Sequence, residues 1–99
     1  MSDRGSSKAS KETLEDALLQ IKTRKEMNAF LMSILTAKEL EELPKRLAIF
    51  SMLKKELPHH EIATKVGVGV ATVTRGSLEL QRGYIQQTSW WRDQTPVGA

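Results

Sequence analysis

The sequence contains no cysteine in its 99 residues, which excludes a disulfide framework and thiolate metal sites and fits a reducing compartment. No apolar run approaches the roughly 20 residues that a membrane-spanning helix needs. Residues 1–12, MSDRGSSKASKE, contain no apolar signal core. We therefore expect a soluble, cytoplasmic protein that has no membrane partner.

A large excess of one charge is also missing, because 15 Lys and Arg stand against 12 Asp and Glu and the net charge is only +3. A mildly basic chain can bind a nucleic acid but need not do so. At this length the chain forms one small domain, which buries only about 60–65% of its unfolded surface. A dimer that shares one core would remedy this shortage, so we expect a homodimer.

Neither a nucleophile–base pair nor a cofactor loop is evident, so we expect no enzymatic activity and no cofactor. The adjacent His59 and His60 would point about 100° apart on a helix and cannot share a metal ion, so no metal site is expected. These histidines are either solvated or in contact with DNA. Glu39, Glu41 and Glu42 fall in the first turns of an expected helix, where negative charge complements the helix dipole.

Apolar residues recur at helical spacing along most of the chain, after a polar stretch at residues 1–9 that we expect to be a disordered arm. A first helix starts near Ser10. The motif TRKE at residues 23–26 has the pattern of a capping box and begins a second helix. The apolar face of the first helix consists of Leu14, Leu18 and Ile21, and the second helix is expected to bury Met27, Phe30, Leu31 and Ile34.

The motif TAKE at residues 36–39 repeats the capping signal and begins a third helix. Pro44 would kink or split this helix, and we expect a bend within one helix because the apolar stripe keeps its phase across the proline. Pro58 restarts the chain at or near a first helical position. The apolar stripe suits a seam against other helices and consists of Leu40, Leu43, Leu47, Phe50 and Leu57.

Beyond Arg82 we expect a last short helix around residues 84–91 and a frayed end at residues 94–99. The tandem Trp90 and Trp91 are expected to cover the edge of the core or a dimer interface rather than to stack on nucleobases. The chain as a whole is therefore interpreted as an all-α fold of five or six short helices, in a single domain at residues 10–93.

The stretch HEIATKVGVGVATVTRGS at residues 60–77 carries the main functional signal. A phosphate-binding loop is rejected, because Thr72 stands where a dinucleotide fingerprint needs its third glycine and no parallel strand precedes it. A helix-turn-helix at about residues 58–80 fits better, with Ala63, Gly67 and Val73 at the small, turn and apolar positions. A merely structural corner between two helices remains the alternative.

The segments LTAKELEELPKRL and GVATVTRGS resemble the tryptophan repressor family over about residues 35–80. The resemblance implies an intertwined homodimer whose recognition helices enter successive major grooves about 34 Å apart on a palindromic operator. It also implies L-tryptophan as a corepressor that fixes the angle of the helix-turn-helix. The function indicated is that of a sequence-specific DNA-binding transcriptional repressor. The alternatives are a ligand-independent DNA-binding regulator of the same type and a helical protein-binding adaptor.

The resemblance also implies a ligand site. In that family the indole lies between two arginines, and guanidinium planes can stack on such a ring. By position the implied ligand-binding residues are Arg46, Arg75, Gly76, which gives the ring room, and Thr36 with the backbone near Leu35, both of the partner subunit. Where the family has a serine that helps to hold the ammonium of the ligand, this chain has Glu79. Glu79 either holds that ammonium or pairs with Arg75 or Arg82.

The second helix of the expected helix-turn-helix is rich in small apolar groups and hydroxyls, which can approach base edges, thymine methyls and phosphates closely. The candidate DNA-contacting residues are His59, His60, Lys65, Gly69, Val70, Ala71, Thr72 and Thr74.

Overall fold

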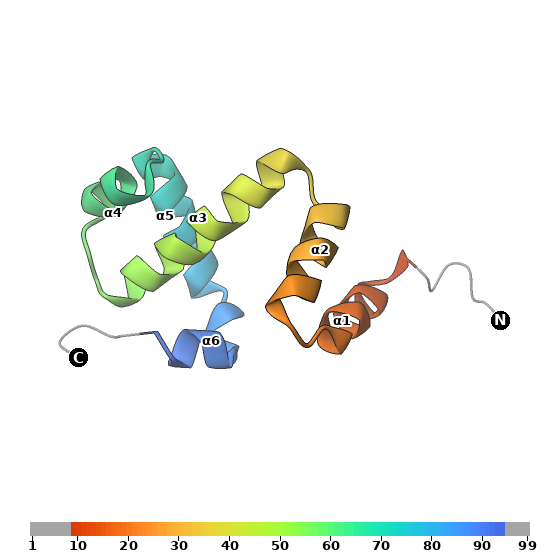
Figure 1. Cartoon of the computed structure of the whole chain (residues 1–99). Helices are drawn as coiled ribbons and strands as arrows, with labels where there is room; N and C mark the ends of the chain where they lie inside the picture. The colour runs from red at the N-terminus through yellow and green to blue at the C-terminus, as the bar shows by residue number, and fades with distance from the viewer. Residues whose placement is uncertain (1–8, 95–99) are drawn as a thin grey trace. The chain divides into compact units, whose positions relative to one another are not determined.

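The computed structural model of the chain describes residues 9–94 (Figure 1), so the expectations for residues 1–8 and 95–99 lie outside the described residues. The helices are α1 (Lys11–Gln20), α2 (Arg24–Ile34), α3 (Ala37–Lys54), α4 (His59–Val66), α5 (Val70–Gln81), the 3₁₀ turn η2 (Ile85–Gln87) and α6 (Ser89–Arg92). Every regular element in this part of the chain is helical, which confirms the all-α fold. None of these helices is both long and apolar enough to cross a membrane.

Two helix starts follow the capping motifs of the sequence. Thr36 and Glu39 form a complete capping box, since the Glu39 N–H donates to Thr36 Oγ1 at 3.1 Å and the Thr36 N–H donates to Glu39 Oε1 at 2.8 Å. Thr23 Oγ1 likewise accepts from the Glu26 N–H at 3.1 Å, but the Glu26 carboxylate accepts from the N–H of Lys22. Both predicted helix starts are therefore confirmed, and the second reciprocal bond reaches one residue further back than the motif predicts.

Contacts divide the chain into two units that meet between Leu40 and Glu41, inside α3. In the N-terminal unit no residue of α1 or α2 is buried, and the side chain of Ile34 is 52% exposed. The expectation that the second helix buries Met27, Phe30, Leu31 and Ile34 is therefore wrong for the single chain. Two short helices offer each other too little surface to close a core.

Helix α3 continues unbroken through Pro44, so the proline does not split it. The predicted apolar stripe is buried only in part, since Leu43 and Leu47 are 38% and 44% exposed whereas Leu57 packs against the core. Ile49 is the buried residue of this helix. The expected seam is therefore wrong for Leu43 and Leu47 in the single chain, because α4 and α5 pack around Ile49 instead.

The core of the C-terminal unit joins three helices. Its buried members are Ile49 of α3, Ile62 and Ala63 of α4, and Val73 of α5. Partly buried apolar side chains surround them, namely Met52, Leu53, Leu57, Val66 and Val68. This small cluster fixes α4 and α5 against the second half of α3 and thereby positions the site described below.

The C-terminal segment lies against the end of α3. The last short helix expected around residues 84–91 is present as α6, but it begins only at Ser89, because Thr88 in an extended conformation separates it from η2. The Lys54 ammonium donates to the Trp91 carbonyl at 2.5 Å and lies 4.9 Å from the centre of the Trp91 ring. Ser51 Oγ donates to Gln94 Oε1 at 2.9 Å. Trp91 therefore covers part of α3, and Gln94, expected to be frayed, is held in place.

Candidate functional site

Helices α4 and α5 are joined by a short glycine turn. Gly67 adopts the left-handed conformation (φ 82°, ψ 42°), which costs about 1–2 kcal/mol for a residue with a side chain. The N–H groups of Gly67 and Val68 both donate to the Ala63 carbonyl, at 2.9 and 3.1 Å. Gly69 then returns to an extended conformation as the N-cap of α5. The sequence prediction of a helix, a glycine turn and a second helix is confirmed.

The angle between the two helices is set by small and branched apolar residues. Ile62 and Val73 are completely buried and Ala63 nearly so, and Pro58 precedes α4 as its N-cap residue. These are the positions that a helix-turn-helix needs to be small or apolar. Any larger residue at Ala63 would push α5 away from α4.

The outer surface of this helix pair carries the candidate DNA-contacting residues. Exposed positions are His60, Lys65, Gly69, Val70, Ala71, Thr72 and Thr74, whereas His59 is half-buried. His59 Nδ1 lies 3.4 Å from Thr74 Oγ1, so α4 and α5 meet here at a polar contact. Lys65 lies 3.9 Å from Glu61, and such an exposed pair is weak enough for Lys65 to exchange its partner.

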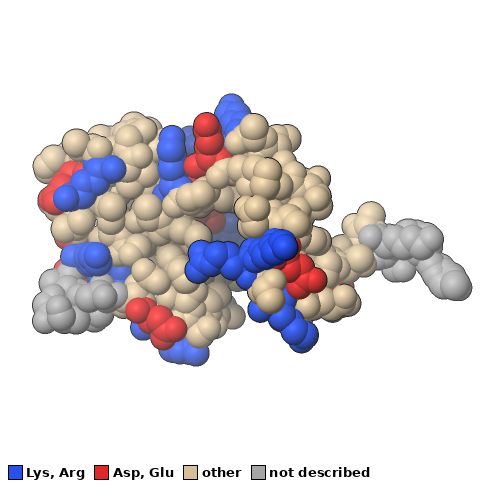
Figure 2. Space-filling view, in the orientation of Figure 1, with Lys and Arg blue, Asp and Glu red and all other residues tan. Residues whose placement is uncertain are grey.

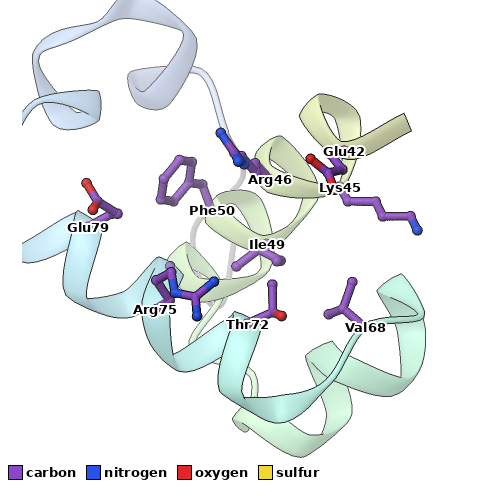
Figure 3. A pocket seen from close by; sticks show the side chains of 10 residues that line it. Glu42, Lys45, Arg46, Ile49, Phe50, Val68, Thr72, Arg75 and Glu79 are labelled. Carbon is purple, nitrogen blue, oxygen red and sulfur yellow. The ribbon is translucent and has the colours of Figure 1, made fainter. Parts of the chain in front are cut away.

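A cleft of about 660 Å³ lies between α3 and α5 (Figure 3). This volume is typical of a site for a small organic ligand. Arg46, Arg75, Gly76 and Glu79, four of the predicted ligand-binding residues, line it together. The other lining residues are Glu42, Lys45, Ile49, Phe50, Val68 and Thr72. Leu35 and Thr36 are not among the described lining residues and belong to the N-terminal unit.

Sequence reasoning missed the apolar wall of this cleft, although helical spacing contained a signal for it. Phe50 follows Arg46 by four residues and therefore lies one turn further along the same side of α3. Thr72 precedes Arg75 by three residues on α5 in the same way. Figure 3 shows Arg46 and Phe50 extending from α3 and Arg75 from α5. A flat apolar ligand that carries charged groups would meet both an aromatic ring and guanidinium groups here.

Gly76 has a structural reason to lack a side chain. A Cβ atom at this position would lie 2.9 Å from Ile49 Cγ2 and 3.9 Å from Leu53 Cδ1. Helix α5 therefore approaches α3 at Gly76 more closely than a residue with a Cβ atom at this position would allow. Gly76 was expected to leave space for the ring of a ligand. In this structure the side chain of Ile49 lies next to that space.

Glu79 pairs with Arg82, one of the two arginines considered from the sequence. Arg82 Nη1 lies 3.0 Å from Glu79 Oε1, and the side chains are 60% and 49% exposed. The Arg82 guanidinium also lies 5.1 Å from the centre of the Tyr84 ring. Both side chains are exposed, and an exposed ion pair between residues three apart on a helix is weak.

The charge of the site is mixed. The cleft is lined by Lys45, Arg46 and Arg75 against Glu42 and Glu79, which suits a ligand with charges of both signs. Figure 2 shows Lys and Arg interspersed with Asp and Glu on the face in view. Across residues 9–94, no group of three or more His, Cys, Asp and Glu is placed to hold a metal ion.

Comparisons with known proteins give one family model and several relatives that are similar to this chain. The family model described as Trp repressor protein matches residues 9–95. A Trp operon repressor homolog of Xylella fastidiosa is 33% identical over 76 residues, which are 76% of this chain and 83% of the relative. Homologs of the same name from Aliivibrio fischeri and Vibrio vulnificus are 41% identical over 64 and 59 residues, or 64% and 59% of this chain. The chain spans 59% and 58% of their lengths. No solved structure matches.

Proposed function

Since the chain belongs to the Trp repressor family, we propose that it is a cytoplasmic transcriptional repressor without enzymatic activity. It binds a palindromic operator in double-stranded DNA as a homodimer, with L-tryptophan as its corepressor. The observation that carries this proposal is the cleft between α3 and α5, which joins a ligand-sized space to the second helix of a helix-turn-helix.

The cleft explains how a ligand would control DNA binding. Arg46 extends from α3 and Arg75 from α5, so one ligand that contacts both guanidinium groups fixes α5 relative to α3. Because α5 packs on α4 through Val73, the reading helix and its partner would be fixed as a unit. Ligand binding then raises the population of the conformation that fits two major grooves.

The exposed surface of α4 and α5 provides the DNA contacts in this proposal. In this proposal Lys65 and His60 contact phosphates, which supply affinity without sequence information. Val70, Ala71 and Thr74 are exposed at the start of α5 and are short enough for a close approach to base edges. Gly69 and Thr72 complete the candidate DNA-contacting set, and His59 acts by holding Thr74.

A homodimer is supported by the apolar surface that each unit leaves uncovered. Leu14, Leu19, Met32 and Ile34 are exposed in the N-terminal unit, and Leu43, Leu47 and Leu78 are exposed in the C-terminal unit. Residues 10–93 would thus form a single DNA-binding and dimerisation domain only with the partner subunit. That subunit would also bring its Thr36 and Leu35 to the ligand. Sedimentation at micromolar concentration should give one species of twice 11.1 kDa, whereas a folded monomer would contradict the dimer.

Selection of bound sequences from random duplex DNA, with and without millimolar tryptophan, tests the proposal directly. We expect a palindromic sequence to be enriched, more strongly with tryptophan, and its affinity to fall steeply with salt because phosphate contacts release counterions. Enrichment that does not depend on tryptophan would leave a ligand-independent regulator. Selection that enriches no sequence would favour a protein-binding adaptor instead.

Two arginine variants distinguish an effect of the ligand site from an effect of the net charge of the protein. Arg75→Ala should abolish the tryptophan dependence of DNA binding while the far-UV circular dichroism is unchanged, because Arg75 lines the cleft and is exposed rather than part of the core. Arg92→Ala removes an equal charge from α6, outside the cleft lining, and should keep the tryptophan dependence. Equal loss in both variants would show that net charge, and not the cleft, carries the effect.

A further inference from the structure

We propose that His59 controls the direction in which the Thr74 hydroxyl forms hydrogen bonds, so that the base selected by Thr74 changes when His59 gains a proton. This inference rests on the proposed function of α5 as the helix that reads the operator. It makes His59 a positioning residue, because His59 acts on DNA through Thr74, and it predicts a sequence preference that depends on pH.

The contact joins the two helices of the helix-turn-helix. His59 is the first residue of α4, and Nδ1 of its half-buried ring lies 3.4 Å from Oγ1 of Thr74 on α5 (both helices are labelled in Figure 1). Thr74 is exposed, as are Val70 and Ala71, which precede it by four and three residues and therefore share its side of α5. The Thr74 hydroxyl thus lies between His59 and the surface proposed to meet the bases.

The protonation of the imidazole decides what this hydroxyl can offer to a base. A threonine hydroxyl has one proton to donate and two lone pairs that accept. When His59 is neutral and carries its proton on Nε2, Nδ1 accepts the hydroxyl proton of Thr74, and Oγ1 is left to accept from a base amino group. When His59 is protonated, Nδ1–H donates to Oγ1, and the hydroxyl proton of Thr74 is free for a base acceptor.

The major groove distinguishes these two states of Thr74. Cytosine presents an amino donor there, whereas thymine presents the acceptor O4 beside its methyl group. Neutral His59 therefore favours cytosine opposite Thr74, and protonated His59 favours thymine. The methyl group adds a preference that does not change with pH, so the change of preference between two pH values is the quantity that tests the inference.

Histidine is the side chain whose charge ordinarily changes between about pH 5 and about pH 8, and the chain contains two. On α4, Ile62 and Ala63 share the side of His59 and carry no charge. Glu61 of the same helix lies 3.9 Å from Lys65.

The neighbouring elements add residue types that ordinarily keep their charge throughout this pH range. On α5 the charged residue next to Thr74 is Arg75, which lines the cleft. Helix α3 ends with Lys54, and the turn that follows contains the exposed Lys55 and Glu56. A pH-dependent change at the contact therefore comes from a histidine.

His60 provides the matched control. It is adjacent to His59 but exposed, and it leaves α4 about 100° further around the helix. His59→Asn and His60→Asn remove the same titratable group from neighbouring positions. Because asparagine keeps a polar atom near the place of Nδ1, His59→Asn retains a polar side chain beside Thr74 that does not titrate.

Competition binding of the full chain, with millimolar tryptophan, tests the inference on the operator obtained by selection from random duplex DNA. The competing duplexes carry cytosine or thymine at each position of a half-site in turn. At one position, the affinity ratio of cytosine to thymine should fall about threefold to tenfold when the pH is lowered from about 8 to about 5.5. His59→Asn and Thr74→Val should each make this ratio independent of pH. His60→Asn and Thr74→Ser should retain the change, since both keep the imidazole of His59 and a hydroxyl at position 74.

Each other outcome has a definite meaning. A wild-type ratio that is equal at the two pH values refutes the inference and leaves the DNA-binding function standing. A change that is lost in His60→Asn and kept in His59→Asn refutes it too, and so does a change that persists in Thr74→Val, because the histidine would then act without the hydroxyl. Since the readout is a ratio, a variant that is only partly folded gives the same answer. If selection enriches no sequence at either pH, the proposed function fails and this inference fails with it.

Discussion

Gly76→Ala tests the close approach of α5 to α3, on which the shape of the cleft depends. The new Cβ atom would lie 2.9 Å from Ile49 Cγ2, a distance at which one of the two helices must move. Ile49 is only 2% exposed, and its Cγ2 is attached directly to Cβ, so the methyl group cannot rotate away independently of the rest of the side chain. We therefore expect α5 to be displaced from α3.

Two opposing contributions set the change in the free energy of unfolding that Gly76→Ala causes. Alanine is favoured over glycine inside a helix by about 1 kcal/mol, and overpacking of a core costs about 1–3 kcal/mol. The free energy of unfolding should therefore fall by up to about 2 kcal/mol. Because these contributions can nearly cancel, the decisive variant is Ile49→Leu, which removes the Cγ2 methyl. In the Gly76→Ala background, Ile49→Leu should be about 1–2 kcal/mol more favourable than in the wild type.

Urea denaturation of the four proteins, wild type, both single variants and the double variant, measures this coupling. Tryptophan titration should also show weaker binding in Gly76→Ala, with partial recovery in the double variant. Gly69→Ala is the control, because a Cβ atom there meets nothing within 4 Å. The reasoning is refuted if Gly76→Ala stabilises the protein by about 1 kcal/mol. It is also refuted if the change in the free energy of unfolding of the double variant equals the sum of the changes in the two single variants to within about 0.5 kcal/mol.

Three further predictions concern the turn, the DNA surface and the C-terminal segment. Gly67→Ala should lower the free energy of unfolding by about 1–2 kcal/mol, since φ is 82° there; an unchanged urea midpoint would contradict this. Thr74→Val should alter operator preference by about 1–3 kcal/mol, whereas Lys65→Ala should weaken all duplexes alike; competition binding measures both, and identical profiles would refute the distinction. Lys54→Met should cost about 1–2 kcal/mol and change tryptophan fluorescence, because the ammonium contacts Trp91; an unchanged spectrum would count against that contact.

The sequence by itself determined the local structure. Hydroxyl residues at Thr23 and Thr36, each followed by a glutamate three positions later, specified two helix starts, because capping bonds form between residues that are close in the chain. Gly67 specified the turn before α5, since a left-handed residue is most easily glycine. The helix-turn-helix was likewise available from spacing, and Arg46 and Arg75 were available as ligand-site residues only from the resemblance to the family.

Only the tertiary structure decided which sides of these helices meet. Periodicity showed that α3 has an apolar stripe, but Ile49 rather than Leu47 became buried, because the packing of α4 and α5 selects the contact side. The contact of Gly76 with Ile49 was undetermined for the same reason. Local bonds are encoded within a few residues, whereas packing depends on the summed shapes of distant segments, which no single stretch of sequence contains.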